Sequence, residues 1–293
     1  MVLSNPVPGI FGKRMGPAQA AAKLRKRDKN AMECLAEIAE SNDRKALAYI
    51  WIAVELGCNI IVFGENGADL ERFVDAVSVF VPPHMNLMDL RTGRASDPRI
   101  NFMGVIQTGK LAPQRNQRIA ERYMPDYVIS TNVRNGELND TFALSKHGVS
   151  FISQITGDFI NMPIVKALQS RPFKVEKRNI QMLDLSVFIE NEGNAIKLKT
   201  ITEYRWLCRA ETVKYKEKSM VEYSNMHIAC NGNLDDGKAL KSKVMGTYGR
   251  LSLFSEEETM EELHKRANFL SSLGDATQSV TGHHSVEMYY EIK

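Results

Sequence analysis

The chain has 293 residues, of which 43% are hydrophobic and 25% are charged, and its formal net charge is +3 at pH 7. This composition is typical of a globular protein with enough apolar material for one large domain or two smaller ones. The small net charge does not by itself indicate a nucleic-acid or membrane-surface protein, and no apolar run approaches the roughly 20 residues that cross a bilayer.

The cysteines and the first residues bear on the compartment. Cys34, Cys58, Cys208 and Cys230 are far apart, and no C-x-x-C pair suggests a zinc or redox site. Scattered thiols are typical of a reducing cytoplasm. The opening residues lack the charged-then-apolar design of a secretory signal. We therefore expect a cytoplasmic protein that is at most peripheral at a membrane.

Residues 1–40 are expected to form a lead-in and a basic helix. The first 20 residues are rich in Pro, Gly and Ala, which favours an extended segment. Residues 23–27, Lys-Leu-Arg-Lys-Arg, then open a helical pattern. A solvated helix face accounts for this basic cluster more simply than a surface for membranes or nucleic acid does.

The predicted core begins with a helix and a strand. Residues 41–43, Ser-Asn-Asp, can cap a helix, and the pattern of residues 46–56 predicts a buried helix that ends at Gly57. Residues 58–63 form a β-rich apolar run, which predicts a buried strand. A glycine-punctuated turn follows, and then an amphipathic helix over residues 69–79.

This strand, turn and helix have the layout of a phosphate-binding P-loop, whose pattern is G-x-x-x-x-G-K-[ST]. On that pattern the second required glycine is Asp69, the lysine is Leu70 and the serine or threonine is Glu71. The sequence therefore predicts the scaffold of a nucleotide site without its cationic chemistry. The candidate cofactor-binding residues are Gly64, Glu65, Asn66, Gly67, Ala68, Asp69, Leu70 and Glu71.

Strands and helices continue to alternate along the chain. The predicted strands are residues 86–90, 100–106, 125–130, 149–155 and 182–189, and the predicted helices are residues 114–122, 138–146 and 164–169. Residues 195–204 continue beyond a turn as the second arm of a hairpin. This alternation predicts an α/β fold over residues 41–205, with a mostly parallel sheet flanked by helices.

Residues 206–293 change in character and are expected to form a C-terminal extension, strand-like at first and then helical. Residues 213–228 are polar but alternate in the manner of a strand, and residues 231–237 predict a loop. Helices are predicted over residues 238–248 and 256–273.

Polar residues of the extension have simple structural explanations. Ser255 precedes the last predicted helix and Glu258 follows three residues later, which is the pattern of a capping box rather than of a nucleophile. The adjacent histidines His283 and His284 point apart on either a helix or a strand. No metal site is predicted.

Several short motifs recur in the order and at the spacing of a known family. Residues 122–129, Arg-Tyr-Met-Pro-Asp-Tyr-Val-Ile, resemble the R-x-R-P-D-x-I-I entry to a Walker B strand. Arg134 and Glu137 match positions of the G-E-V-R-G-x-E motif that follows it. Residues 46–55 and 183–188 are similar to a helix and a strand of the same family. From about residue 40 onward the chain resembles the archaeal branch of the type II/type IV secretion ATPases, the motors of the archaellum and of type IV pili.

The resemblance implies a RecA-like P-loop NTPase core with C-terminal helices, and hexamers with ATP and Mg²⁺ at subunit boundaries. It places the catalytic positions at Asp89, Asn132, Arg134 and Glu137. The family's glutamate beside Asp89 is Met88 here. The Walker B glycine–glutamate is Thr131-Asn132, and an amide cannot accept a proton at neutral pH. The expected histidine box, residues 151–156, contains no histidine. The family's separate N-terminal domain is also expected to be absent.

The altered loop changes the electrostatics of the expected site. A unit charge pair about 4 Å apart, at an effective dielectric constant near 20, is worth roughly 4 kcal/mol. Leu70 removes one such attraction, while Asp69 and Glu71 add repulsion that Arg72 only partly offsets. Because about 1.4 kcal/mol is tenfold in affinity, a loss of several orders of magnitude in nucleotide binding is expected. Acids at a helix N-terminus complement its dipole, so we expect the two carboxylates to replace a phosphate.

The leading hypothesis is a secretion-ATPase-like subunit of a type IV pilus or archaellum system that is defective in ATP hydrolysis and acts structurally or as a regulator. Its expected partners are related ATPase subunits, in a homo- or hetero-oligomeric ring, and a membrane platform protein. ATP and Mg²⁺ are cofactors only if the altered site still binds them. One alternative is an active motor in which Asp89, Arg134 and Glu137 carry catalysis. The other is a non-motor protein that binds nucleic acid, the least favoured partner, through residues 23–29.

Overall fold

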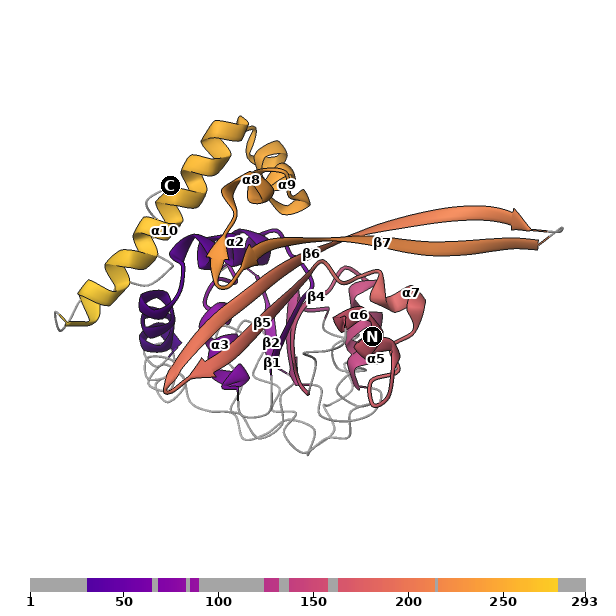
Figure 1. Cartoon of the computed structure of the whole chain (residues 1–293), viewed down its shortest axis with the longest axis horizontal. Coiled ribbons are helices and arrows are strands. Elements are labelled where there is room, and N and C mark those ends of the chain that lie inside the picture. Colours follow the sequence, from indigo (N-terminus) through magenta and orange to yellow (C-terminus); the bar gives the residue numbers. More distant parts are fainter. Residues whose placement is uncertain are drawn as a thin grey trace, which may run out of the picture.

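The computed structural model describes most of the expected core and its extension (Figure 1). The described residues are 31–64, 68–82, 85–89, 124–131, 137–157, 163–213 and 216–278. The strand predicted over residues 100–106, the helix predicted over residues 114–122, the basic cluster and the histidine pair lie outside them.

One eight-stranded sheet organises the chain. Its strands are β1 (Ile60–Gly64), β2 (Leu87–Asp89), β3 (Tyr127–Thr131), β4 (Ser150–Thr156), β5 (Leu185–Glu192), β6 (Ala195–Val213), β7 (Lys216–Cys230) and β8 (Asn233–Leu234). The spatial order is β2-β3-β4-β1-β5-β6-β7-β8. Every pairing from β2 across to β5 is parallel, and the pairings of β6, β7 and β8 are antiparallel.

Helices cover both faces of this sheet. They are α2 (Arg44–Glu55), α3 (Leu70–Ser78), α5 (Glu137–Ser145), α6 (Ile164–Gln169), α7 (Lys177–Ile180), α8 (Asp236–Leu240), α9 (Lys243–Ser252) and α10 (Glu256–Gln278), and residues 31–41 are also helical. The central strands alternate between two hydrophobic clusters, because successive side chains of a strand point to opposite faces. Ile60 and Val62 pack toward α2, α3 and α10, whereas Ile61 packs toward α5 and α6. The α/β fold class, with a mostly parallel sheet flanked by helices and a helical C-terminal extension, is confirmed.

The local signals that begin the core are confirmed. The Asp43 side chain accepts a hydrogen bond from the backbone N–H of Lys45, and α2 follows with its residues from Ala46 to Val54 all buried. Gly57 ends this helical segment with a φ of 72°, a conformation that favours glycine.

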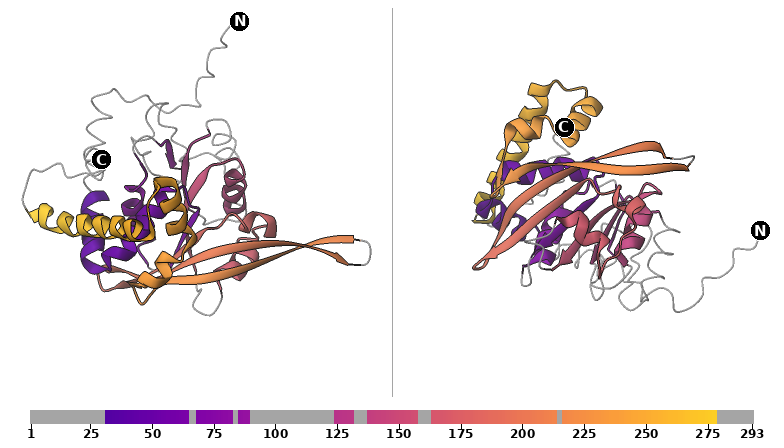
Figure 2. Two further views of the ribbon diagram at one scale, coloured as in Figure 1. Left: turned by 90° about the horizontal axis from the view of Figure 1, so that it is seen from above. Right: turned by 45° about the vertical axis from the view of Figure 1, so that its right-hand side comes forward.

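The last helix is fastened to the core. α10 packs along α2 on the side of the molecule away from the other helical layer (Figures 1 and 2). Arg266 is fully buried between them, and its guanidinium lies 4.9 Å from the ring centroid of Trp51 on α2. Its Nη2 lies 2.6 Å from a carboxylate oxygen of Glu55, and its Nε donates to Glu262 at 3.2 Å. The C-terminal extension therefore shares the hydrophobic core of the sheet rather than packing separately.

Strands β6 and β7 continue as a hairpin well beyond the body of the molecule (Figure 1). β6 runs unbroken from Ala195 to Val213, so the predicted domain boundary between residues 205 and 206 falls inside a strand. The division into 41–205 and 206–293 stays a prediction. Where the hairpin leaves the body, Trp206 donates its indole N–H to the carbonyl of Leu183 at 2.8 Å. The part of the hairpin from residue 207 to residue 222 is called the arm below.

Two details of the extension differ from the prediction. The segment predicted as one helix over residues 238–248 contains two helices, because Ser242 caps the N-terminus of α9 by accepting a hydrogen bond from the N–H of Met245. The predicted loop over residues 231–237 contains β8, which pairs with the end of β7. None of the described helices is both long and apolar enough to cross a bilayer.

Candidate functional site

The predicted site residues follow parallel strands that end at one edge of the sheet. The residues that close β1, β2, β3 and β4 are Gly64, Asp89, Thr131 and Thr156. From β1 the chain crosses through α3 to the far strand β2, and from β4 it crosses to β5 on the other side of β1. Open α/β sheets bind ligands at the carboxyl ends of strands where the strand order reverses. This carboxyl edge is the candidate site.

The turn after β1 has the predicted form at both of its ends. β1 ends at Gly64 and α3 begins at Leu70, while residues 65–67 lie outside the described residues. A Cβ added to Gly64 would lie 2.7 Å from the carbonyl oxygen of Ile189 and 2.8 Å from the Cβ of Ala68. No side chain fits there, so the first glycine of the loop is required by the close approach of β5.

Asp69 occupies the amino end of α3 with its own carboxylate. Its Oδ1 accepts a hydrogen bond from the backbone N–H of Arg72 at 3.2 Å, and its own N–H donates to the side chain of Asn191 at 3.2 Å. The expected helix cap is therefore present. Glu71 adds a second carboxylate in the first turn of the same helix. An anionic ligand at this helix terminus would meet a negative charge that already holds one of the free N–H groups.

The position of the P-loop lysine is part of the hydrophobic core. Leu70 is only 2% exposed and packs in the cluster that α3 shares with α2 and the sheet. The cation nearest in sequence, Arg72, forms ion pairs with Asp69 at 3.5 Å and with Glu37 of the helix over residues 31–41. Arg72 thus neutralises protein carboxylates in place of a phosphate.

The structure locates only one of the four predicted catalytic residues in full. Asp89 ends β2, is 4% exposed and pairs in register with Ile129 of β3. Asn132 and Arg134 lie outside the described residues, and Glu137 begins α5 with no described side chain. The described residues therefore bring Asp89 to the same edge as the altered loop, and the roles of the other three stay predictions.

Buried polar residues near this edge were not predicted from the sequence. The hydroxyl groups of Ser130 and Ser153 share a hydrogen bond of 2.6 Å, and Thr141 on α5 donates to Ser130 at 3.3 Å. Gln154 on β4, between Val62 and residue 131, is 8% exposed, and its Oε1 has no hydrogen-bond partner among the residues that the structure describes. Polar residues inside apolar strands were the only sequence signal for them.

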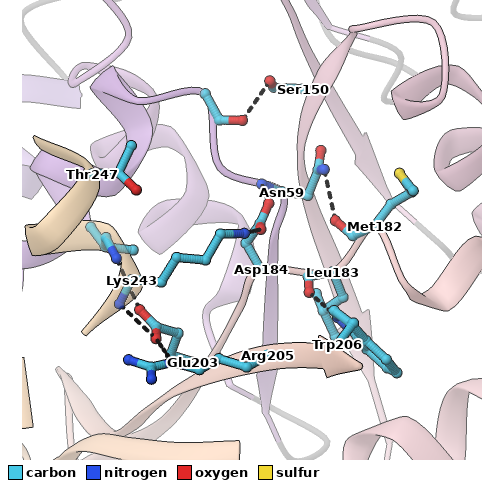
Figure 3. A network of polar contacts seen from close by, with 12 residues as sticks. Asn59, Ser150, Met182, Leu183, Asp184, Glu203, Arg205, Trp206, Lys243 and Thr247 are labelled. Carbon is cyan, nitrogen blue, oxygen red and sulfur yellow. Dashed lines mark hydrogen bonds and ion pairs between the residues drawn. The ribbon is translucent and has the colours of Figure 1, made fainter. Parts of the chain in front are cut away.

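A polar network fastens the opposite, amino edge of the sheet (Figure 3). Asn59 donates its backbone N–H to Asp184 at 3.0 Å and its side-chain amide to the carbonyl of Met182 at 2.7 Å, and it accepts from the N–H of Phe151 at 3.2 Å. Lys243 at the start of α9 donates to Asp184 at 3.1 Å. Burial alone would lower the pKa of Lys243, but the charge and hydrogen bond of Asp184, together with the Glu203 charge and Cys58, raise it. Asp184 therefore has a structural role, because it joins the start of β1 to the start of α9.

Glu203 is the buried centre of the same network. It is 1% exposed and accepts hydrogen bonds from the backbone N–H groups of Lys243 and Val244, at 2.9 and 3.1 Å. It also accepts from the phenol of Tyr49 at 3.2 Å and from Arg205 at 3.2 Å. Burial, reinforced by the Glu203 charge, raises the pKa of Tyr49 well above its ordinary value, so this phenol stays a donor. The carboxylate binds the N-terminus of α9, which is an architectural task.

Two of the described thiols are unreactive, the buried Cys34 and the largely buried Cys58, whereas Cys230 is exposed. Burial raises the pKa of Cys34 and of Cys58, which suppresses the nucleophilic thiolate form. Within the described ranges, no three side chains of His, Cys, Asp or Glu gather where they could hold a metal ion.

Comparisons with known proteins give distant likenesses. No family model matches the chain. An uncharacterised protein of Methanocaldococcus jannaschii, MJ1287, is 25% identical over 246 residues, covering 78% of this chain and 86% of that protein.

Among solved structures, the VirB11 ATPase of the Brucella suis type IV secretion system matches with a TM-score of 0.44 and 18% identity, over 52% of this chain and 50% of that one. The Legionella pneumophila ATPase DotB matches with a TM-score of 0.36 and 8% identity, over 80% and 60%. The pilus retraction motor PilT matches with a TM-score of 0.37 and 11% identity, over 73% and 60%. The chain thus spans between half and three fifths of the length of these structures.

Proposed function

We propose that this chain is a secretion-ATPase-like subunit, built on a RecA-like core, that has lost ATP hydrolysis. Its task is structural or regulatory within a type IV pilus or archaellum system. It occupies a place in a ring with related ATPase subunits and docks to a membrane platform protein at the cytoplasmic side. The motifs that resemble the secretion ATPases support the family, and the carboxyl edge supports the loss of activity.

One observation carries the loss of hydrolysis. Where a P-loop would present a lysine and a hydroxyl to phosphates, Leu70 is buried in the core and Asp69 caps α3. Removing the lysine forfeits an attraction of roughly 4 kcal/mol at an effective dielectric constant near 20, and the added carboxylates repel an anion on the same scale. Leu70 fills a packed site in the core. Its side chain therefore cannot turn outward and leave room for a water molecule or a metal ion that would take over the role of the missing lysine.

The proposal is tested by nucleotide binding and turnover with the whole protein. Calorimetric titration with Mg-ATP is expected to show no binding up to millimolar nucleotide, and phosphate release is expected to equal that of a blank. A dissociation constant in the micromolar range together with turnover would overturn the proposal. Circular dichroism on the same sample establishes that the chain is folded.

A matched set of variants separates the charge from the missing lysine. Asp69→Asn combined with Glu71→Gln removes the two carboxylates yet keeps an N-cap residue, and it tests whether repulsion alone blocks nucleotide. Leu70→Lys restores the cation at the cost of a buried leucine. If neither change creates binding but their combination does, the altered loop itself is the cause. Binding already present in the parent protein contradicts this account.

A further inference from the structure

The corner between α9 and α10 exposes two leucines that are separated by one residue in the sequence. Leu251 is 72% exposed and Leu253 is 91% exposed, and they are two of the four large hydrophobic residues that are exposed among the described residues. The corner lies at the top of Figure 1, where α9 turns into α10. The fold leaves both side chains in water, so a contact outside the folded chain that covered them would remove apolar surface from water.

The corner is held rigidly in this form. Leu253 has a φ of 58°, in the left-handed region where leucine is disfavoured, and the next residue, Phe254, donates its N–H to the carbonyl of Gly249 at 2.8 Å. A Cβ on Gly249 would lie 2.7 Å from the hydroxyl oxygen of Thr259, so the two helices approach closely here. The ring of Phe254 also meets that of Tyr248 edge-on at 6.2 Å. The leucines are therefore presented on a fixed frame.

Exposed carboxylates follow the leucine pair along the chain. Glu256, Glu257 and Glu261 are exposed in the first turns of α10. Glu258 is engaged in the capping box, in which it accepts from the N–H of Ser255 at 2.7 Å. Within the described residues no ion pair is formed by Glu256 or Glu257, and Glu261 pairs only with Lys265 at 3.8 Å. The corner thus carries the exposed leucine pair and these carboxylates at the start of α10, together with one exposed cation, Arg250, in the last turn of α9.

The chain itself contains a segment of the complementary chemistry. Residues 23–29 read Lys-Leu-Arg-Lys-Arg-Asp-Lys, so five of seven are basic and Leu24 lies among them. They lie outside the described residues. The described chain begins with the helix over residues 31–41, which is joined to α3 by the Glu37–Arg72 ion pair. The corner follows the C-terminal end of α9. The N-terminal end of α9 is bound by Glu203 at the amino edge of the sheet.

We propose that the α9–α10 corner of one copy binds the basic segment, residues 23–29, of a second copy. The leucines supply the apolar contact, and the glutamates attract the Lys and Arg side chains and set the orientation. Because the two surfaces differ, the contact is head-to-tail, the kind that closes into a ring or continues as a filament. This contact requires no nucleotide, so its test is independent of the test of the proposed loss of hydrolysis.

A charge swap tests the proposal with the full-length protein. Glu256→Lys with Glu257→Lys reverses the corner without touching the capping box, and Arg25→Glu, Lys26→Glu and Arg27→Glu reverse the segment. Each set alone is expected to weaken self-association about tenfold or more in sedimentation velocity, and the two sets together are expected to restore most of it. Raising the salt concentration is expected to weaken self-association of the parent protein, because salt screens the contacts between charged side chains. The apolar contact of the leucines is not expected to weaken.

Leu253→Asn is the matched control for the apolar part. Asparagine tolerates the left-handed region better than leucine does, so this change is expected to keep or raise the melting temperature while it weakens association. A leucine needed only for folding would give the reverse result. Leu35→Asn, in the buried core, is a control that is expected to lower the melting temperature.

Three outcomes would overturn the proposal. The first is a parent chain that stays monomeric at all accessible concentrations, which would also follow if the segment bound the corner of its own copy. The second is self-association that neither charge reversal changes. The third is a segment that binds vesicles of phosphatidylcholine and phosphatidylserine, while a fluorescent peptide of residues 21–30 fails to bind the protein.

Discussion

Asp69 and Leu70 show how two neighbouring residues alter the chemistry of a loop while its path is kept. The strand before them and the helix after them have the predicted layout, and Gly64 is required by the approach of Ile189. The cap at Asp69 stabilises α3 without any ligand. Leu70 joins the core and contributes its burial to folding. Both residues thus favour the stability of the free protein over anion binding.

The first prediction concerns this cap. Asp69→Ala is expected to lower the free energy of unfolding by about 1 kcal/mol, because the N–H of Arg72 loses its acceptor. Asp69→Asn is expected to remain close to the parent, since asparagine caps helices as well as aspartate does. Urea denaturation of the three proteins measures both effects. Equal stability of Asp69→Ala and the parent would show that the carboxylate is not a cap in solution.

The second prediction concerns the buried amide of Gln154. Its Oε1 has no hydrogen-bond partner in the described part of the chain, and a buried polar group in that state costs about 1–3 kcal/mol. Gln154→Met, of similar volume, is expected to raise the free energy of unfolding by about 1 kcal/mol. Ser153→Ala, which removes the hydrogen bond to Ser130, is expected to lower it. A destabilised Gln154→Met would contradict the lack of a partner for this amide.

The third prediction is a pH effect at the last helix cap. Hydrogen bonds from the backbone N–H and side chain of Ser255 lower the pKa of Glu258. A depressed carboxyl pKa stabilises the folded state above the unfolded value, about 4.3 for glutamate, and this gain is lost as the pH falls through the folded pKa. Glu258→Gln is therefore expected to flatten the acid side of a melting-temperature profile below about pH 5. A melting-temperature profile of Glu258→Gln that is the same as that of the parent would contradict this prediction.

Residue-scale patterns were readable where the cause is local. The caps at Asp43 and at Ser255–Glu258 need only a short stretch of chain, so the sequence predicted both correctly. Gln154 and the Ser130–Ser153 pair depend on which strands become neighbours, and no local pattern records that. The catalytic assignments to Asn132 and Arg134 stay predictions.

At the scale of elements, α10 depends on one buried cation. Arg266 joins α10 to α2 through Glu55, to α9 through the hydroxyl of Tyr248 at 2.9 Å, and to its own helix through Glu262. It also lies over the Trp51 ring. Removing one partner of a buried ion pair leaves the other charge without compensation, which is more costly than never having buried the pair.

The fourth prediction follows from this arrangement. Arg266→Met is expected to lower the free energy of unfolding by about 3 kcal/mol, because Glu262 is left buried and charged. The double change Glu262→Gln with Arg266→Met is expected to lose less, since the uncompensated carboxylate is gone. Denaturant unfolding with tryptophan fluorescence reports both, because Trp51 lies under the guanidinium. Additive losses in the double variant would contradict a coupled pair.

The boundaries of the elements were less predictable than their types. α6 has the predicted limits, and α3, α5 and β4 lie within a residue or two of them. The helices α8 and α9 were merged in the prediction, because both are amphipathic and only the cap at Ser242 separates them. The length of β6 was underestimated, since the prediction ended this strand at residue 204 and β6 continues to Val213.

For the whole molecule, the sequence predicted the layered α/β architecture from the alternation of strands and helices. It did not predict the order of the strands, which long-range packing decides, nor the arm that projects from the sheet. The position of α10 against α2 likewise depends on contacts between residues far apart in the chain.

The fifth prediction tests whether the arm contributes to the stability of the body. Residues 207–222 pair in register only with one another within the described part of the chain. Replacing them by Asn-Gly between Trp206 and Tyr223, which are paired in register, should close a two-residue hairpin turn. The melting temperature is expected to change little, because the aromatic contact between Trp206 and Tyr223 at 5.2 Å is kept. A large loss would mean that the arm contacts the body.

The continuity of β6 has a mechanical consequence. The strand is hydrogen-bonded to β5 within the sheet and to β7 along the whole arm, and β5 in turn pairs with β1, which ends at Gly64. A neighbouring molecule that binds the outer end of the arm could therefore apply a force that acts on the sheet where β6 enters it. Bending or twisting of the arm would reach the altered loop through the backbone hydrogen bonds from β6 to β5 and from β5 to β1, past the register shift between Phe188 and Ile189.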